Sequence, residues 1–527
     1  MINKISIGRQ SALIMFFLVL GLVGSIFLSG EFLAADLDSN DLFELAFENR
    51  SASLKDELGY NLTDDAMDSF IYQFDQEELK TLVESDYLKL LSGKNNRLPE
   101  TDTIAFEEAI DDVDFLIKTL KFGYAGYQIN GGDERFNQAC GEIIIELENW
   151  LTSDNRIFIK EFEEILYSEI NFIEDTHFSI AGRQMGSDYS LYVSNEYIFN
   201  KVEKDGKIYY KEFGDNGKFL SLGDKGSEEV MWPVLGQSGQ LVYLPGFFKP
   251  YDSDYSSGIK DNIKFELEDG EEVNEVEVVL YPLRSVRQQQ DSNIYQSSEI
   301  DGIPLIEVNS FAARDNESSQ QLEKFVEDSS DLSDAENLII DIRGNTGGSD
   351  HYPYSWIQNF TGQKDISRNS LSVNVRTDVS YALMENSLNK FPAEQRAQLM
   401  QQLKELFMPL DNGWGDVNIA VPKFIPNETK IIVIIDSYVM SAGESFVRYL
   451  KQMENVIFIG SNTRGMGMVG NVGSFNLFNS EIEVHAGVTI FMDTDMINRE
   501  GIGYMPDFWV DDSQALGIAV EILSGGI

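Results

Sequence analysis

The 527-residue sequence contains very few of the side chains on which many catalytic and structural sites depend. Cys140 is its only cysteine, which excludes an intrachain disulfide and a cysteine-based metal cluster. Three histidines are present, so any chemistry that needs an imidazole must use His177, His351 or His485.

Basic residues are also scarce. The chain has 40 Lys and Arg against 88 Asp and Glu, a formal net charge of −48 at pH 7. A chain this negative repels nucleic acid and anionic lipid, so we expect neither as a partner. The acidic residues are spread along the whole length, which indicates a solubilising surface. Hydrophobic residues make up 43% of the chain, enough for the buried cores of two or three domains.

The first residues have the layout of an export signal. Lys4 and Arg9 precede an apolar run over about 12–28, and acidic residues follow it. The run is near the upper length limit of a cleaved signal and the lower limit of a membrane-spanning helix. We therefore predict a signal peptide or signal anchor over residues 1–35, with the remainder periplasmic or extracellular and in contact with a membrane only through this segment.

The rest of the chain divides into three regions by its hydrophobic pattern. Residues 36–187 repeat apolar side chains at spacings of three and four, which predicts an N-terminal helical domain. Residues 188–297 alternate polar and apolar residues between turn residues, which predicts a β-rich domain, with a degenerate PDZ-like module as one interpretation. Residues 298–527 alternate fully apolar strands with helices, the pattern of an α/β fold.

Two apolar strands of the last region end in sequences that can carry chemistry. The stretch LIIDIRGNTGGSD passes into a loop whose Gly347 and Gly348 can bring backbone N–H groups close to a ligand. The stretch VIIDSYVMSAGESF places Ser441 and Ala442 at the start of a helix, where negative charge is favoured. By itself Ser441 is either a nucleophile or a helix N-cap, and Glu444 is interpreted as its capping-box partner.

Four motifs occur in order along the chain: DIRGNTGG, SAGE, GSNTRG and REGIGYMPD. Together they resemble peptidase family S41, the C-terminal-processing and tricorn-core proteases, over residues 298–515. The upstream stretch IEDTHFSI matches the D-x-H sequence of many members. The resemblance implies a ClpP/crotonase-like α/β catalytic domain that hydrolyses peptide bonds of peptide or protein substrates, with no metal or other cofactor.

The branches of this family differ in their catalytic base. The processing proteases use a lysine 25 residues after the serine, where this sequence has Met466, whose thioether cannot accept a proton. The other branch uses a histidine oriented by a glutamate, and the resemblance implies Ser441, His177 and Glu500 in these roles, with a base that titrates at roughly pH 6–7. Asp175 either fixes His177 or caps a turn. The backbone N–H groups implied as the oxyanion hole are those of Gly347, Gly348 and Ala442.

Other residues have more than one interpretation. His177 is the implied base or a structural histidine, and His351, directly after the glycine loop, is the second candidate for the base or a rim residue. His485 alternates with the apolar residues of a strand, which predicts a place on its solvated face. Tyr124 and Tyr127 are assigned to the cleft by family analogy.

Two other functions are considered. A non-catalytic protein that binds peptides or other ligands on the same scaffold is favoured by Met466, while Ser441, His177 and Glu500 speak against it. A crotonase-like acyl-CoA enzyme is disfavoured by the export signal, because coenzyme A is cytosolic. The sequence indicates neither the cleavage specificity nor the oligomeric state.

Overall fold

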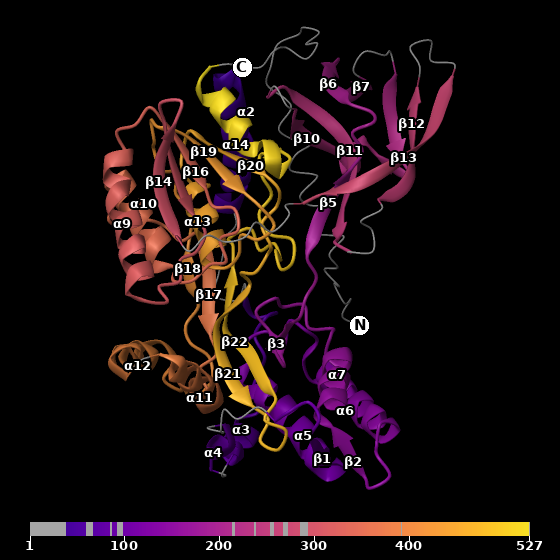
Figure 1. Ribbon diagram of the computed structural model, residues 1–527, viewed down its shortest axis with the longest axis vertical. Coiled ribbons are helices and arrows are strands. Elements are labelled where there is room, and N and C mark those ends of the chain that lie inside the picture. Colours follow the sequence, from indigo (N-terminus) through magenta and orange to yellow (C-terminus); the bar gives the residue numbers. More distant parts are fainter. Residues whose placement is uncertain are drawn as a thin grey trace.

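The computed structural model describes residues 38–59, 67–84, 87–91, 98–212, 217–236, 239–252, 258–266, 272–284, 293–391 and 393–525. The predicted signal segment lies outside the described residues. Within them, no helix combines the length and the apolar character needed to cross a membrane. Figure 1 shows the molecule as an α/β part, a β-rich part and a group of N-terminal helices.

The α/β part is built on parallel strands that are buried on both faces. Along β16, Leu338 and Ile340 pack against one layer of helices, and Ile339 packs against the opposite layer. Because successive side chains of a strand point to opposite faces, a fully apolar strand needs a helical cover on each side. The strands in spatial order are β14 (Tyr295–Ile300), β15 (Ile303–Val308), β16 (Asn337–Asp341), β19 (Lys430–Ile435), β20 (Val456–Gly460) and β23 (Phe508–Trp509). All neighbouring pairs are parallel except β14 and β15.

Helices cover both faces of this sheet. One layer contains α9 (Asn316–Leu332), α10 (His351–Thr361) and α13 (Ala442–Leu450). The other contains α14 (Asp512–Leu523) and, from the start of the chain, α2 (Ser39–Gly59). Arg50 of α2 is held by an ion pair of 2.7 Å with Asp507. The predicted α/β class is confirmed.

The N-terminal helices share one core with a second, antiparallel sheet. In Figure 1 the long strands β21 and β22 reach from the α/β part to these helices. The strands of the sheet are β3 (Ser179–Ile180), β4 (Arg183–Gln184), β17 (Ser370–Asn374), β18 (Asn418–Ala420), β21 (Val469–Asn476) and β22 (Glu483–Met492). The helices around it are α3 (Gln76–Glu84), α4 (Tyr87–Leu91), α5 (Phe106–Gly123), α6 (Gly132–Asn149), α7 (Ile159–Glu169), α11 (Asp378–Ser387) and α12 (Ala393–Phe407). The short strands β1 (Thr103–Ala105) and β2 (Arg156–Phe158) form a ribbon of their own. The hairpin β3–β4 pairs with β22, so the segment with His177 is anchored to the C-terminal half of the chain.

The β-rich part continues the large sheet. Its strands are β5 (Tyr189–Val193), β6 (Phe199–Lys204), β7 (Lys207–Glu212), β8 (Lys218–Leu222), β9 (Lys225–Gly226), β10 (Met231–Leu235), β11 (Leu241–Pro250), β12 (Ile259–Glu266) and β13 (Val273–Leu283), with the short helix α8 (Ser227–Val230) between β9 and β10. Strand β10 pairs with β23 through Val234 and Trp509, which joins the two parts. The domain boundaries given by the sequence stay predictions.

Candidate active site

Ser441 lies in a sharp turn between β19 and α13. Its backbone has φ +53° and ψ −120°, a conformation that is uncommon for any residue other than glycine. Its side chain makes no capping hydrogen bond to the helix. Ser441 therefore occupies the N-cap position of α13, as one interpretation expected, but its hydroxyl does not cap the helix. Backbone strain of this kind persists only where the surroundings impose it, and it is concentrated at functional sites.

Glu444 supplies part of that constraint. One oxygen of its buried carboxylate accepts hydrogen bonds from Thr463 Oγ1 (2.6 Å) and Gly465 N (2.7 Å), and the other accepts one from Met466 N (2.8 Å). The carbonyl of Met466 in turn accepts a 3.1 Å hydrogen bond from the N–H of Ser441. The capping-box prediction is wrong, because Glu444 holds the 463–466 loop instead of reaching back to the helix start. Burial raises the pKa of Glu444, and these three hydrogen bonds oppose the rise.

The glycine loop packs directly on Ser441. A β-carbon added at Gly347, where φ is +79°, would lie 2.7 Å from Ser441 Cβ and 3.0 Å from Ala442 N. Only glycine allows this approach. The N–H of Gly347 donates a 2.9 Å hydrogen bond to Asn345 Oδ1, so this amide is already engaged. In the part of the chain that the structure describes, the N–H groups of Gly348 and Ala442 make no hydrogen bond, and these two are the donors available to an oxyanion.

His177 is half-buried at the entrance to the β3–β4 hairpin. Its backbone N–H donates to Asp175 Oδ1 (2.8 Å), and its ring Nδ1 is buried with no partner among the described residues. Burial, together with a smaller effect of the Arg464 charge, lowers the pKa of His177 to about 4, although a hydrogen bond with the backbone of Val469 opposes the shift. This value is below the near-neutral one expected from the resemblance, because the ring is desolvated. The imidazole is therefore neutral at pH 7 and able to accept a proton.

Glu500 acts on the chain beside His177. One carboxylate oxygen accepts from Thr176 N (2.8 Å) and Thr176 Oγ1 (2.6 Å), and the other accepts from Met468 N (3.1 Å). These contacts tie the residue before His177 to the loop that supports Ser441. No hydrogen bond joins the His177 ring to Glu500 or to Ser441 Oγ among the described residues. Such bonds are often long before substrate binds.

A second buried carboxylate accompanies Glu500. Asp175 accepts a 2.8 Å hydrogen bond from the hydroxyl of Tyr124 as well as the bond from the His177 N–H. Burial raises the pKa of Asp175, and burial together with the charge of Asp175 raises the pKa of Glu500. Two like charges this close disfavour simultaneous ionisation, so the pair retains a proton at pH values where isolated carboxylates have lost theirs.

The two tyrosines assigned to the cleft are buried. Tyr124 is 2% exposed and Tyr127 is 1% exposed. The Tyr127 ring stacks on Phe136 at 4.3 Å, and its hydroxyl donates to Asp133 (3.0 Å). Neither ring therefore faces an open surface, and Tyr124 contributes through Asp175.

The other two histidines make local contacts. His351 is the exposed first residue of α10, and its Nδ1 lies 3.4 Å from the hydroxyl of Ser355 one turn further on. His485 lies on β22, where its Nδ1 is 3.1 Å from Ser179 Oγ. Its ring is half-buried, and the Nε2 lies 3.6 Å from a carboxylate oxygen of Glu483.

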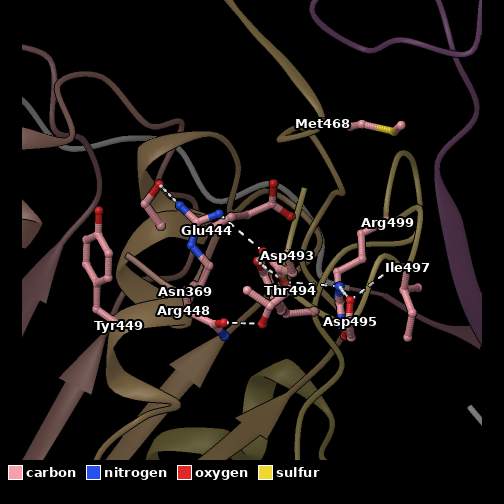
Figure 2. A network of polar contacts seen from close by, with 12 residues as sticks. Asn369, Glu444, Arg448, Tyr449, Met468, Asp493, Thr494, Asp495, Ile497 and Arg499 are labelled. Carbon is pink, nitrogen blue, oxygen red and sulfur yellow. Dashed lines mark hydrogen bonds and ion pairs between the residues drawn. The ribbon is translucent and has the colours of Figure 1, made fainter. Parts of the chain in front are cut away.

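A charged network links the helix of Ser441 to the loop that carries Glu500 (Figure 2). Arg448 of α13 pairs with Asp493 at 3.2 Å, and Asp493 also pairs with Arg499 at 3.0 Å. Arg499 holds Asp495 at 2.9 Å as well. Neither this network nor the role of Thr176 was predicted from the sequence. The charged residues of the network are visible in the stretch DTDMINRE, and Thr176 is the middle residue of D-T-H. Neither pattern shows which distant residue each side chain contacts.

No group of three or more His, Cys, Asp or Glu in the described ranges is arranged to hold a metal ion.

Comparison with known families places the catalytic region. Residues 302–510 match the family model described as Peptidase family S41. These residues belong to that family. The S41 region contains the glycine loop, Ser441 and Glu500, while His177 lies upstream of it.

Similarity to individual proteins is much weaker. No curated protein matches the chain. Among solved structures, mature CPAF complexed with lactacystin is 15% identical with a TM-score of 0.37, over 80% of this chain and 97% of that chain. The photosystem II D1 C-terminal processing protease is 12% identical with a TM-score of 0.33, over 77% and 93%. A putative peptidase from Parabacteroides merdae ATCC 43184 is 11% identical with a TM-score of 0.40, over 79% and 96%. At these values the likenesses say nothing about which residues react or what they act on.

Proposed function

We propose that this S41 peptidase is exported and cleaves peptides or proteins by attack of Ser441, with His177 as the base. The strained turn at Ser441 carries the proposal. It presents a hydroxyl that the helix does not use, against a glycine that admits no side chain and beside two N–H groups that have no partner among the described residues.

In this mechanism Ser441 Oγ attacks the peptide carbonyl, and the neutral ring of His177 accepts the hydroxyl proton. The carbonyl oxygen becomes an oxyanion, and the N–H groups of Gly348 and Ala442 donate hydrogen bonds to it. One such donor typically contributes about 2.7–4 kcal/mol to the transition state. His177 then returns the proton to the leaving amine. In the second half of the reaction it takes a proton from water, which attacks the acyl-enzyme, and it gives that proton to Ser441 Oγ as the bond to the acyl group breaks.

Glu500 keeps His177 in place through the backbone. Its hydrogen bonds to Thr176 and Met468 fix the segment on which the ring is mounted. Glu500 is therefore a positioning residue.

A lysine base is disfavoured. Met466 occupies the dyad position, and its backbone serves Ser441 and Glu444. The next lysine along the chain, Lys451, follows the end of α13, where its Nζ donates to Met505 O (3.3 Å). The nine residues of α13 separate it from Ser441, and the ten steps between the two residues span about 15 Å at 1.5 Å per residue.

Labelling by a fluorophosphonate probe tests the proposed chemistry, because only an activated serine reacts. We expect the wild-type protein to be labelled and to hydrolyse peptides, and Ser441→Ala to do neither while melting at the same temperature. A wild-type protein that binds peptides but is not labelled would instead be a ligand-binding protein on the same scaffold.

Export rests on residues 1–35 and needs its own test. A reporter enzyme that is active only outside the cytoplasm is fused after this segment and, as the control, after the same segment with Lys4 and Arg9 changed to Glu. Activity of the first fusion only is the expected result. Equal inactivity of both would remove export from the proposal.

A further inference from the structure

Two arginines share a single carboxylate beside the site. Arg464 Nε lies 3.1 Å from Asp188 Oδ1, and Arg284 Nη2 lies 3.1 Å from Asp188 Oδ2. Each oxygen of Asp188 is thus engaged by a different guanidinium. The three side chains are 21%, 13% and 26% exposed for Arg464, Arg284 and Asp188, so the cluster is partly shielded from water. Among these three side chains, two positive charges thus face one negative charge.

The guanidinium groups retain unused donors. Arg464 Nη2 donates to Gln184 Oε1 (3.2 Å), a neutral partner. Arg284 Nη1 is buried without a hydrogen-bond partner among the described residues. The Arg284 guanidinium lies 4.2 Å from the centre of the Tyr251 ring and 5.8 Å from that of Tyr438. Aromatic faces attract a cation but do not neutralise it. A partly buried charge without a full counter-charge is costly.

Arg464 is close to the proposed nucleophile and base. Its backbone N–H donates a 2.9 Å hydrogen bond to Val439 O, two residues before Ser441. The side chain bonds to Gln184, which pairs with Ser179 in the hairpin directly after His177. Its charge also acts on the imidazole, because it contributes to the low pKa of His177.

Asp188 and Arg284 complete this arrangement from two other segments. Tyr189, the residue after Asp188, donates a 2.8 Å hydrogen bond to the carbonyl of Gly501, which follows Glu500. Tyr438, the ring near Arg284, is three residues before Ser441. The cluster therefore lies where the segments of all three proposed catalytic residues meet.

The charge of the whole chain makes this local excess informative. With a net charge of −48, the protein repels anionic ligands at long range. A general attraction for anions is thus absent, and an anion is favoured only where it reaches the guanidiniums directly.

We propose that Arg284 and Arg464 form a subsite for one carboxylate of the peptide substrate. The inference rests on the proposed function and adds a substrate class to it: peptides with an acidic side chain a few residues from the bond that is cleaved. Guanidinium groups suit this role because their planar N–H donors match the two oxygens of a carboxylate.

The wild-type protein provides the first test. Short fluorescence-quenched peptides are compared in which each position in turn holds Glu or its neutral isostere Gln, and in which the C-terminus is free or amidated. A charge-assisted hydrogen bond predicts that kcat/KM is roughly tenfold or more higher for the carboxylate form at one position. A Glu preference at one position is the expected result, and a preference for the free C-terminus alone would overturn the proposal. Equal rates for every pair would overturn the proposal without any variant.

Variants then assign the preference to the cluster. Arg284→Gln and Arg464→Gln should bring the ratio of the two rates toward one, and Arg464→Lys, which keeps the charge, should retain part of it. The matched control is Arg183→Gln on the β3–β4 hairpin, the hairpin that also carries Gln184. Arg183 pairs with Glu164 at 2.7 Å, and both side chains are exposed. It removes the same charge from the chain and should leave the preference intact. A preference that survives both Arg→Gln changes, or that Arg183→Gln also removes, would refute the subsite.

Binding separates this inference from the proposed function. Fluorescence anisotropy of the same labelled peptides with Ser441→Ala measures the preference without turnover. Hydrolysis by the wild type without a carboxylate preference keeps the peptidase and removes the subsite. A carboxylate preference in binding without hydrolysis or labelling keeps the subsite and removes the proposed mechanism.

Discussion

Substituting the glycine that packs on Ser441 should separate catalysis from folding. Gly347→Ala places a carbon atom 2.7 Å from Ser441 Cβ, whereas carbon atoms in contact prefer about 3.5–4.0 Å. The nearest backbone atoms, Met440 O at 2.8 Å and Ala442 N at 3.0 Å, leave no other direction for relief. Ser441 must therefore shift by about 1 Å, and a misplacement of that size typically costs about 100-fold in rate.

A control for the backbone strain exists in the same loop. Gly344 has φ +73° against +79° for Gly347, but no atom lies within 4 Å of a β-carbon added there. Each alanine has the same conformational cost, about 1–2 kcal/mol. Urea denaturation should therefore show a loss of stability for both variants, with a larger loss for Gly347→Ala.

The rates should differ far more than the stabilities. Peptide hydrolysis measured as kcat is expected to fall about 100-fold in Gly347→Ala and by less than about twofold in Gly344→Ala. Fluorophosphonate labelling should follow the same order. Similar rates for the two folded variants would show that the close packing on Ser441 has no part in the reaction.

Three further predictions concern the buried acidic groups and the base. Because burial lowers the pKa of His177 to about 4, the kcat/KM of the free enzyme should stay constant as the pH falls to about 5 and should be lost near pH 4. A loss of kcat/KM already at pH 6–7 would contradict the buried position of the ring. The raised pKa of Glu500 means that the folded state holds a proton that the unfolded state has released, so stability should fall as the pH rises from about 4.5 toward 8. Glu500→Gln should flatten this slope in melting curves, and an unchanged slope would assign it to other groups. Glu444→Gln replaces one carboxylate oxygen by an amide nitrogen, which cannot accept a hydrogen bond from Met466 N or Thr463. The substitution should lower the free energy of unfolding by about 1–3 kcal/mol and should also lower the rate of peptide hydrolysis. Full stability in denaturant would show that the 463–466 loop does not depend on the Glu444 carboxylate.

Local sequence patterns determined the class of the fold. Leu338, Ile339 and Ile340 are all apolar, and a strand of that kind needs helices on both faces, which is what surrounds it. The absence of a lysine at position 466 could also be seen in the sequence. Methionine cannot accept a proton in any fold, so a Ser–Lys dyad with this position is excluded. The glycines of the 344–348 loop indicated a close approach of the backbone, although not the partner.

Only the tertiary structure decided how Ser441 is used. Ser441 is followed by two small residues and then by Glu444. This sequence is the same as that of an ordinary helix with a serine cap. The difference is that Glu444 finds its hydrogen-bond donors in the 463–466 loop, and Met466 supplies the acceptor for the Ser441 N–H.

The same holds for the positions of the other polar groups. Tyr124 was expected in a cleft, but its ring is buried against the segment of His177 and its hydroxyl bonds to Asp175. Arg284 and Arg464 are 180 residues apart and meet only through Asp188. Periodicity and residue type determine which short segments form helices or strands and which of their faces are buried, and both can be read directly from the sequence. The partner of a buried polar group depends on which distant segments pack together, and that is decided by the fold as a whole.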